Sequence, residues 1–308
     1  MNPGFRHIDA LVAEPNPQTL AATETVLTNL GFGNVRTTPS LEEANRLISE
    51  GFWDLLVVNG RWPGGDPCDL IVDVRHGRAG PNPFMAIFAL ARDPDTPGAW
   101  RPVRYGVDAM LAAPPQPEDL QEKIALHVEN RKPFIVTSDY VGPDRRQDSK
   151  RVTQYPLMEV PNSLRAKVAG DFDPETSARS IAAMMATINF QKLERQGAQL
   201  VFLAKKVGPD LLVRGMDDAM GAYFDQMTWL GEDVARRLGT DGISTDAAEN
   251  CQSLIQHLTR LGRRRGTPPT QEVGRLIQLA ADVQHAIAKA TTDRAMVSTG
   301  AADTPSAQ

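Results

Sequence analysis

The stretch Asp54-Leu55-Leu56-Val57-Val58-Asn59-Gly60-Arg61-Trp62-Pro63-Gly64-Gly65-Asp66 is typical of an apolar strand that runs into a turn. In an open α/β sheet, ligands bind in the crevice beyond the carboxyl ends of the strands. The residue at the tip of this strand is Asn59, a neutral amide. The chemistry that we expect of the first domain therefore depends on this one position.

Apolar runs and helical segments alternate on both sides of this stretch. We expect strands at 8–13, near 35, and at 55–58, 84–90 and 109–112. We expect helices beginning at 17, 41, 67 and 117, and a short or broken helix at 97–106 because Pro102 interrupts it. This alternation predicts a flavodoxin-like, doubly wound parallel sheet of five strands with helices on both faces.

Four segments of this region resemble the receiver domain of bacterial two-component response regulators. They are 10–17, 53–59 with Pro63-Gly64 four residues later, 83–89 and 106–114. The resemblance covers roughly residues 7 to 130. It implies a CheY-like fold for residues 1–130 and a place in two-component, phosphorelay signalling.

The resemblance also implies which positions would carry phosphorylation. Receivers use two acids for Mg²⁺, a nucleophilic aspartate, a Ser or Thr, and a Lys; here these positions hold Glu14, Pro15, Asn59, Phe88 and Ala113. Only Glu14 keeps the required chemical type. An amide cannot act as the nucleophile, and one carboxylate is too few for tight Mg²⁺ binding. We therefore expect a degenerate pseudo-receiver with no catalytic residue, metal or cofactor.

In receivers the output face is built around the fourth and fifth helices. Here the corresponding segment contains Trp100, Arg101, Arg104 and Tyr105. Arginine and aromatic residues are enriched at interface hot spots, so this segment is a candidate partner surface. The alternative is a solvated face whose aromatic side chains belong partly to the core.

Residues 131–175 form the expected linker, and it contains the motif Tyr140-Val141-Gly142-Pro143-Asp144-Arg145-Arg146. This motif resembles a segment found behind receivers in bacterial signalling proteins. Three interpretations remain open. The linker packs back on a domain, it docks a partner as a short motif, or Arg145, Arg146, Lys150 and Arg151 bind a phosphate or nucleotide.

Residues 176–293 show helical periodicity, and we expect a bundle of four amphipathic helices. Gly208-Pro209 is expected to break the first helix. A heptad-like stripe then predicts a seam along which the bundle could also form a homodimer; its members are Leu212, Met216, Ala219, Tyr223, Met227, Leu230 and Val234. The small polar segment 294–308 is expected to be a disordered tail.

Composition excludes several classes of function. The chain has 308 residues, a net charge of -5 and two distant cysteines, Cys68 and Cys251. These features argue against nucleic-acid binding, zinc sites and disulfide frameworks. No apolar run is long enough to span a membrane, and no signal-peptide core is present at the start. We expect a cytoplasmic protein that does not bind membranes.

These observations predict a response-regulator-like signalling protein that is not an enzyme and acts as a protein–protein interaction adaptor. One alternative is a phosphotransfer protein that uses His257, because phosphotransfer modules are four-helix bundles with an exposed histidine. A second alternative is a DNA-binding output regulator, for which the basic run 263–265 is the candidate contact.

Overall fold

The computed structural model describes residues 3–92, 98–145, 155–240, 245–264 and 266–300. The chain divides into two compact units, Met1–Ile188 and Asn189–Gln308. The first unit is longer than the expected domain of residues 1–130, because it includes the expected linker and the start of the following helix. Within the described residues, no helix is both long enough and apolar enough to cross a membrane.

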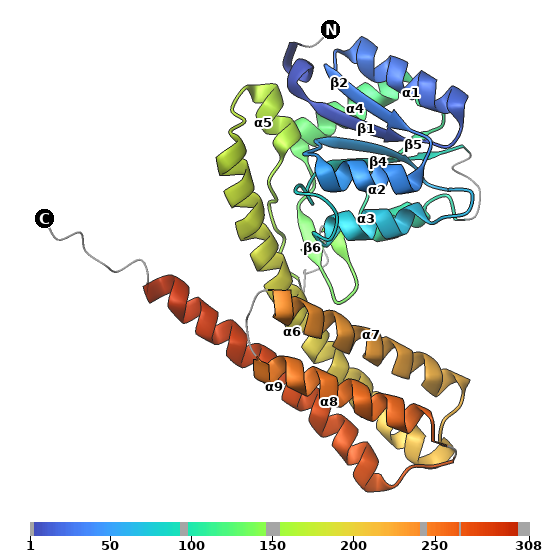
Figure 1. Ribbon diagram of the computed structural model, residues 1–308, viewed down its shortest axis with the longest axis vertical. Helices are drawn as coiled ribbons and strands as arrows, with labels where there is room; N and C mark the ends of the chain where they lie inside the picture. The colour runs from blue at the N-terminus through green and yellow to red at the C-terminus, as the bar shows by residue number, and fades with distance from the viewer. Residues whose placement is uncertain (1–2, 93–97, 146–154, 241–244, 265, 301–308) are drawn as a thin grey trace, which may run out of the picture. The chain divides into compact units, whose positions relative to one another are not determined.

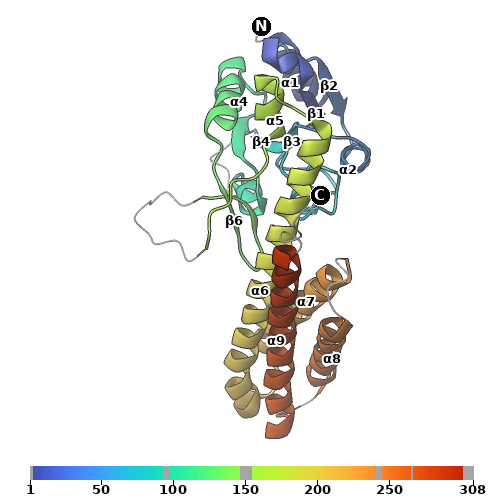
Figure 2. The same cartoon turned by 90° about the vertical axis from the view of Figure 1, so that its left-hand side faces the viewer.

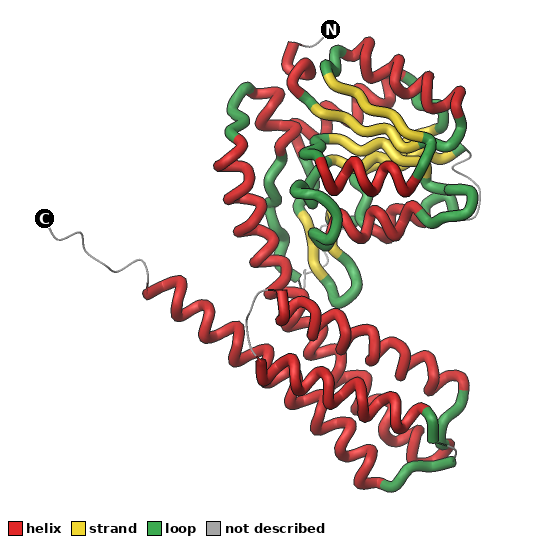
Figure 3. Tube along the Cα trace, in the orientation of Figure 1, coloured by secondary structure: helices red, strands yellow, loops and turns green. Residues whose placement is uncertain are grey.

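A parallel sheet forms the centre of the first unit (Figures 1 and 3). Its strands are β1 (Asp9–Ala13), β2 (Asn34–Thr38), β3 (Leu55–Asn59), β4 (Ala86–Ala91) and β5 (Ala109–Ala112). Among the described residues they form a five-stranded sheet in the order β2-β1-β3-β4-β5, and each neighbouring pair is parallel. This is the flavodoxin-like order, which confirms the predicted fold class.

Helices cover both faces of the sheet (Figure 1). Helices α2 (Leu41–Glu50) and α3 (Pro67–Arg75) contribute to the core on one face, and α1 (Pro17–Leu30) and α4 (Pro117–Asn130) to the core on the other. The predicted short helix is a 3-10 segment, η2 (Arg101–Tyr105), and another, η1 (Pro3–His7), precedes the sheet.

The residues at the start and end of α1 explain where this helix lies in the sequence. The Asn16 side chain accepts hydrogen bonds from the backbone N–H groups of Gln18 and Thr19, both at 3.0 Å. Gly31 ends the helix in the left-handed conformation with φ 105°, which suits a residue without a Cβ. The expected start of this helix at 17 is therefore confirmed.

The expected linker is folded against the sheet domain. We call its described residues, 131–145 and 155–173, the strap. It contains the antiparallel hairpin of β6 (Phe134–Val136) and β7 (Val141–Pro143), and the helix α5 (Ser163–Ala169), which the sequence analysis did not predict. Phe134 and Val136 are fully buried, and they share a cluster with Ile181 and Ile188 of the next helix. The first of the three interpretations therefore describes the hairpin.

The helical C-terminal region was correctly predicted. It contains α6 (Pro174–Arg214), α7 (Asp218–Thr240), α8 (Thr245–Gly262) and α9 (Thr270–Gly300). From Asn189 onward these helices share one apolar core. The second half of α6 runs beside α9 in both views (Figures 1 and 2). This close approach depends on Gly208, because a Cβ there would lie 3.1 Å from Val273.

Three details of the expected bundle were wrong. Helix α6 continues through Gly208 and Pro209 instead of breaking there. Proline removes one backbone hydrogen bond, but buried neighbours such as Val207 and Leu211 pack into the core on both sides of it. The expected stripe is also not one helix, because α6 ends at Arg214 and α7 begins at Asp218, with Ala219 exposed and Met220 buried. Finally, α9 continues to Gly300, past the expected boundary at 294; residues 301–308 lie outside the described residues.

Candidate functional site

A cavity lies beyond the carboxyl ends of β1, β3, β4 and β5, where the fold predicts a ligand site. Its volume is about 640 Å³. Glu14, Pro15, Asn59 and Ala113 all line it, so the structure brings together four of the predicted positions. Other lining side chains include Thr19, Arg61, Trp62, Leu90, Ala91 and Arg92.

Glu14 is fully buried, and an amide satisfies its carboxylate. Asn59 Nδ2 donates to both carboxylate oxygens of Glu14, at 3.0 Å to Oε1 and 2.8 Å to Oε2. The backbone N–H of Asn16 also donates to Oε1, at 2.8 Å. Asn59 Oδ1 accepts from the Arg61 backbone N–H at 2.8 Å, which keeps the Nδ2 group turned toward Glu14.

This geometry determines what the cavity floor can do. A carboxylate that accepts several hydrogen bonds is stabilised without a metal ion. The amide therefore occupies the place beside Glu14 where a cation would interact with the carboxylate. Within the described residues, no group of three or more His, Cys, Asp or Glu side chains could hold a metal ion. Neither Pro15 nor Ala113 supplies a polar side chain to the cavity.

The position assigned to Phe88 was wrong by two to three residues. Strand β4 covers Ala86–Ala91, whereas the expected strand covered 84–90, and its carboxyl end therefore lies at Ala91 and not at Phe88. Phe88 pairs with Val57 in the middle of the sheet and packs edge-on against His127, with ring centroids 6.2 Å apart. Leu90 lies opposite Asn59 in the register, and Leu90 and Ala91 line the cavity. Neither has a hydroxyl group.

The candidate partner surface begins directly beside this cavity. Trp100 is 58% exposed and Arg104 is exposed, whereas Tyr105 is half-buried. Arg101 forms an ion pair with Asp66, which caps α3 through the Cys68 N–H, and its guanidinium lies 5.4 Å from the Tyr105 ring centroid. Arg101 and Tyr105 thus contact each other, and Trp100 and Arg104 are exposed.

The segment η2 packs closely on the turn that follows Asn59. A Cβ on Gly60 would lie 3.1 Å from both the Leu90 carbonyl oxygen and Pro102 Cγ. The Gly60 N–H donates to the same carbonyl at 2.8 Å. The turn between the cavity floor and the candidate surface thus leaves little room for a side chain at Gly60.

The predicted linker motif is built into the hairpin of the strap. Tyr140 Oη donates to the Pro143 carbonyl at 2.9 Å, and a Cβ on Gly142 would lie 2.8 Å from Gly106 Cα. Arg145 Nη1 lies 3.4 Å from the Asp108 carbonyl, to which it donates. Val141 is buried and Asp144 donates its N–H to the Pro133 carbonyl. Arg146, Lys150 and Arg151 lie outside the described residues.

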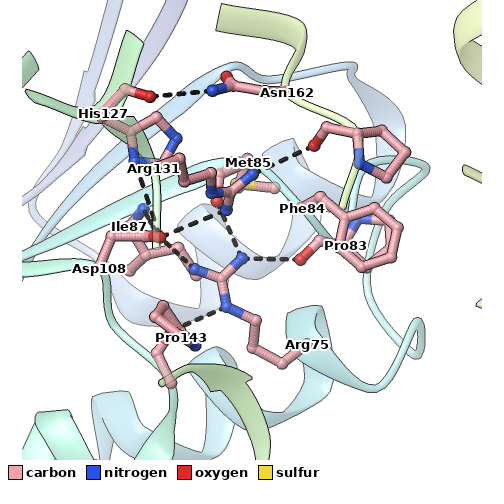
Figure 4. Close-up of polar contacts among 12 residues, drawn as sticks. Arg75, Pro83, Phe84, Met85, Ile87, Asp108, His127, Arg131, Pro143 and Asn162 are labelled. Carbon is pink, nitrogen blue, oxygen red and sulfur yellow. Dashed lines mark hydrogen bonds and ion pairs between the residues drawn. The ribbon is translucent and has the colours of Figure 1, made fainter. Parts of the chain in front are cut away.

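A cluster of buried charges at the amino end of the sheet was missed by the sequence analysis (Figure 4). Arg75 is 1% exposed and donates to the carbonyls of Gly106, Pro83 and Met85 and to Asp108 Oδ2, the last at 2.6 Å. Arg131 of the strap lies 3.3 Å from the other Asp108 oxygen. No local sequence signal marks this cluster, because its members are far apart in the chain.

Burial and neighbouring charges shift the pKa values in this cluster. Burial is the largest influence on Asp108 and would raise its pKa, but Arg131, Arg75, His127 and the hydrogen bond from the Ile87 N–H act against burial and hold the pKa well below its usual range. Burial, reinforced by Arg131, lowers the pKa of His127 to about 3. Burial also lowers the pKa of Arg75 to about 10. His127 is therefore neutral, and Asp108 is a carboxylate neutralised by the two arginines.

A second ion cluster fixes α5 to the same end of the sheet. Lys167 Nζ lies 2.6 Å from Asp9 Oδ2 and 2.7 Å from Asp54 Oδ2, and 4.9 Å from the Phe172 ring centroid. Asp54 is fully buried, and burial raises its pKa above its ordinary value although Lys167 acts against that shift. Asp54 directly precedes β3, so it lies at the end of the sheet opposite the cavity.

His257 of the bundle is buried, with both ring nitrogens engaged. Its Nε2 lies 2.9 Å from the Glu272 carbonyl, and its Nδ1 lies 2.7 Å from Arg260 Nη2. The phosphotransfer alternative expects an exposed histidine, whereas His257 is buried. Of the basic run, Arg263 and Arg264 follow the end of α8 and Arg265 lies outside the described residues.

Over part of its length the chain is similar to solved receiver domains. No family model matches the chain, and no curated protein matches it. Among solved structures, it is similar to the receiver domain of a sensor histidine kinase from Pseudomonas aeruginosa, with 22% identity and a TM-score of 0.34; the match covers 37% of this chain and 92% of that chain.

A putative response regulator from Chloroflexus aurantiacus matches with 25% identity and a TM-score of 0.35, covering 38% of this chain and 93% of that chain. A putative pilus assembly-related protein from Burkholderia pseudomallei matches with 19% identity and a TM-score of 0.34, covering 40% of this chain and 88% of that chain. Each match thus spans less than half of the present chain.

Proposed function

We propose that this chain is a response-regulator-like signalling protein of a two-component or phosphorelay pathway in the cytoplasm, with a pseudo-receiver that is not phosphorylated. It is not an enzyme, and it acts as an adaptor through protein–protein contacts. The sheet order and the location of the cavity support the receiver part of the proposal. The exposed Trp100 and Arg104 support the adaptor part.

One observation carries the proposal, the hydrogen bonding of Asn59 Nδ2 to both oxygens of Glu14. Phosphorylation of a receiver requires a carboxylate nucleophile and a Mg²⁺ ion held by acidic oxygens. Here the nucleophile position holds an amide, and that amide interacts with the remaining acid. Leu90, Ala91 and Ala113 add no hydroxyl or amine that could bind a phosphoryl group.

The test uses the full chain with Mg²⁺ and either acetyl phosphate or beryllofluoride. We expect no added phosphate by mass spectrometry and no shift in thermal unfolding. Glu14→Gln serves as a matched variant, because any genuine modification of the cavity should depend on its acid. Phosphate incorporation in the unaltered chain that disappears in Glu14→Gln would overturn the proposal.

The adaptor role is tested separately by affinity capture with the full chain. We expect capture of a specific signalling protein that is lost when Trp100→Ala and Arg104→Gln are combined. Arg46→Gln is the control, because Arg46 is an exposed arginine on α2 that pairs with Glu43 and Glu50. Equal capture by all three proteins would contradict the assignment of the surface.

A further inference from the structure

The cavity above the sheet has the dimensions of a small-molecule site. Its volume of about 640 Å³ lies within the usual range for such pockets, which is roughly 300 to 1,000 Å³. Such sites are lined mainly by apolar side chains with a few polar groups that orient the ligand. Here Pro15, Pro63, Trp62, Leu90 and Ala113 supply the apolar lining.

The charges of the lining favour a negative ligand. The lining contains one carboxylate, Glu14, and two guanidinium groups, Arg61 and Arg92. Both oxygens of Glu14 accept hydrogen bonds from Asn59, and the residue is fully buried. Arg61 and Arg92 line the same cavity and are both exposed, in contrast to the buried Glu14.

We propose that this cavity binds a small organic anion that has a flat apolar body and a carboxylate or similar charged group. The apolar body lies against Trp62 and the neighbouring proline and aliphatic side chains. The charged group lies against Arg61 and Arg92, because a guanidinium can donate two parallel hydrogen bonds to a carboxylate.

A bare divalent cation fits this lining poorly. It would meet two positive side chains and a single acid whose oxygens are already occupied. A small inorganic anion would leave most of the apolar lining without contact. An anion with an apolar body satisfies both parts of the lining, since apolar burial supplies affinity and the charge supplies orientation.

The binding site is independent of the adaptor role, since a ligand can occupy the cavity whether or not the candidate surface docks a partner. The η2 segment, which follows the exposed Trp100, packs on the turn after Asn59. This turn therefore lies beside both the cavity and the candidate surface. Ligand binding can therefore be measured alone, with no readout that requires a partner.

The experiment compares matched anionic and neutral probes by isothermal titration calorimetry with the full chain. The pairs are benzoate with benzamide and indole-3-acetate with indole-3-acetamide. For an anion of this size we expect a Kd between about 10 µM and 1 mM. We expect each amide to bind at least about tenfold more weakly, because it cannot form a charge-assisted pair with an arginine.

Four variants locate the site. Arg61→Gln and Arg92→Gln should each weaken binding of the anion by about fivefold or more and leave amide binding unchanged. Ala113→Trp should abolish both by filling the cavity. Arg46→Gln is the control with the same change of charge on an exposed helix, and it should bind like the unaltered chain.

Each result has a definite meaning. Anion binding that is selective over the amides and is lost in the Arg61, Arg92 and Ala113 variants supports the proposal. Equal binding of anion and amide overturns the charge assignment, and binding unchanged in Ala113→Trp overturns the location. Failure of both anions to bind the folded chain, verified by its thermal unfolding, overturns the site itself. None of these results depends on whether the chain accepts phosphate.

Discussion

Buried carboxylates at the two ends of the same sheet have different kinds of partner. At the carboxyl end, Glu14 is satisfied by the neutral amide of Asn59. At the amino end, Asp54 and Asp108 are buried and paired with Lys167, Arg75 and Arg131. In α/β folds chemistry is usually performed at the carboxyl end. In this chain buried ion pairs lie instead at the opposite end, where they hold the strap against the sheet.

Removing Arg75 from its buried ion pair with Asp108 should produce the largest loss of stability. Arg75→Met removes four hydrogen bonds and leaves Asp108 buried with reduced compensation, which should lower the free energy of unfolding by about 3–5 kcal/mol. Urea unfolding followed by circular dichroism measures the change. Arg78→Met is the control, since Arg78 pairs with Asp73 nearer the surface and should cost less than about 1 kcal/mol. Similar losses for the two variants would show that the amino end is not specially dependent on charge.

Lowering the pH should reduce the stability of the folded chain through protonation of His127. Burial lowers the pKa of His127 from 6.5 to about 3 in the folded chain, so the unfolded chain binds the proton more readily. The contribution of His127 to stability is therefore complete above pH 6.5 and is lost as the pH falls toward 3, by about 1 kcal/mol per pH unit across the middle of that range.

Unfolding titrations between these pH values should show this slope, and His127→Leu should reduce it. Asp108 acts in the same direction but only at lower pH, because its pKa is held below its usual value of 3.8. An unchanged slope in His127→Leu would assign the acid sensitivity to other groups.

Restoring a charge at the carboxyl end should have a smaller effect, one that depends on metal. Asn59→Asp places a second carboxylate about 3 Å from Glu14, and the repulsion should cost about 1–2 kcal/mol without a cation. Mg²⁺ should recover part of this loss by interacting with both acids. Thermal unfolding with and without Mg²⁺ measures the effect, and the unaltered chain should not respond. A Mg²⁺ response of equal size in both proteins would mean that Asn59 does not determine cation binding.

The smallest effect on stability is expected at the candidate surface. Trp100 is 58% exposed, so Trp100→Ala should change the free energy of unfolding by less than about 0.5 kcal/mol. The same urea titrations provide the measurement. A loss above about 2 kcal/mol would place Trp100 among the residues that hold the fold and would weaken its assignment to partner binding.

Much of the fold could be predicted because its signals are local. The caps at Asn16, Gly31 and Asp66 act on residues within a few positions, and strands alternating with helices already indicate a parallel sheet. Asn59 was correctly placed at a strand tip. Phe88 was misplaced because apolar residues continue on both sides of it, so periodicity could not locate the end of the strand.

The remaining errors come from contacts between distant parts of the chain. Nothing near Lys167 in the sequence indicates that it pairs with Asp9 and Asp54, and residues 131–175 therefore resembled a linker. Pro209 was expected to end a helix, yet burial of its neighbours in the bundle core compensates for the lost hydrogen bond. A sequence pattern indicates which residues suit a helix, but not whether tertiary packing will compensate for a residue that does not.

The strap also affects when the first unit can be completed during synthesis. A chain that has emerged only to residue 130 contains every strand of the sheet but lacks Arg131 and Lys167, so Asp54 and Asp108 still miss partners. A ribosome must add several dozen more residues before these acids are neutralised. A fragment that ends near residue 130 should therefore be prone to misfolding. Fragments made to express the first unit should end at or beyond Ile188.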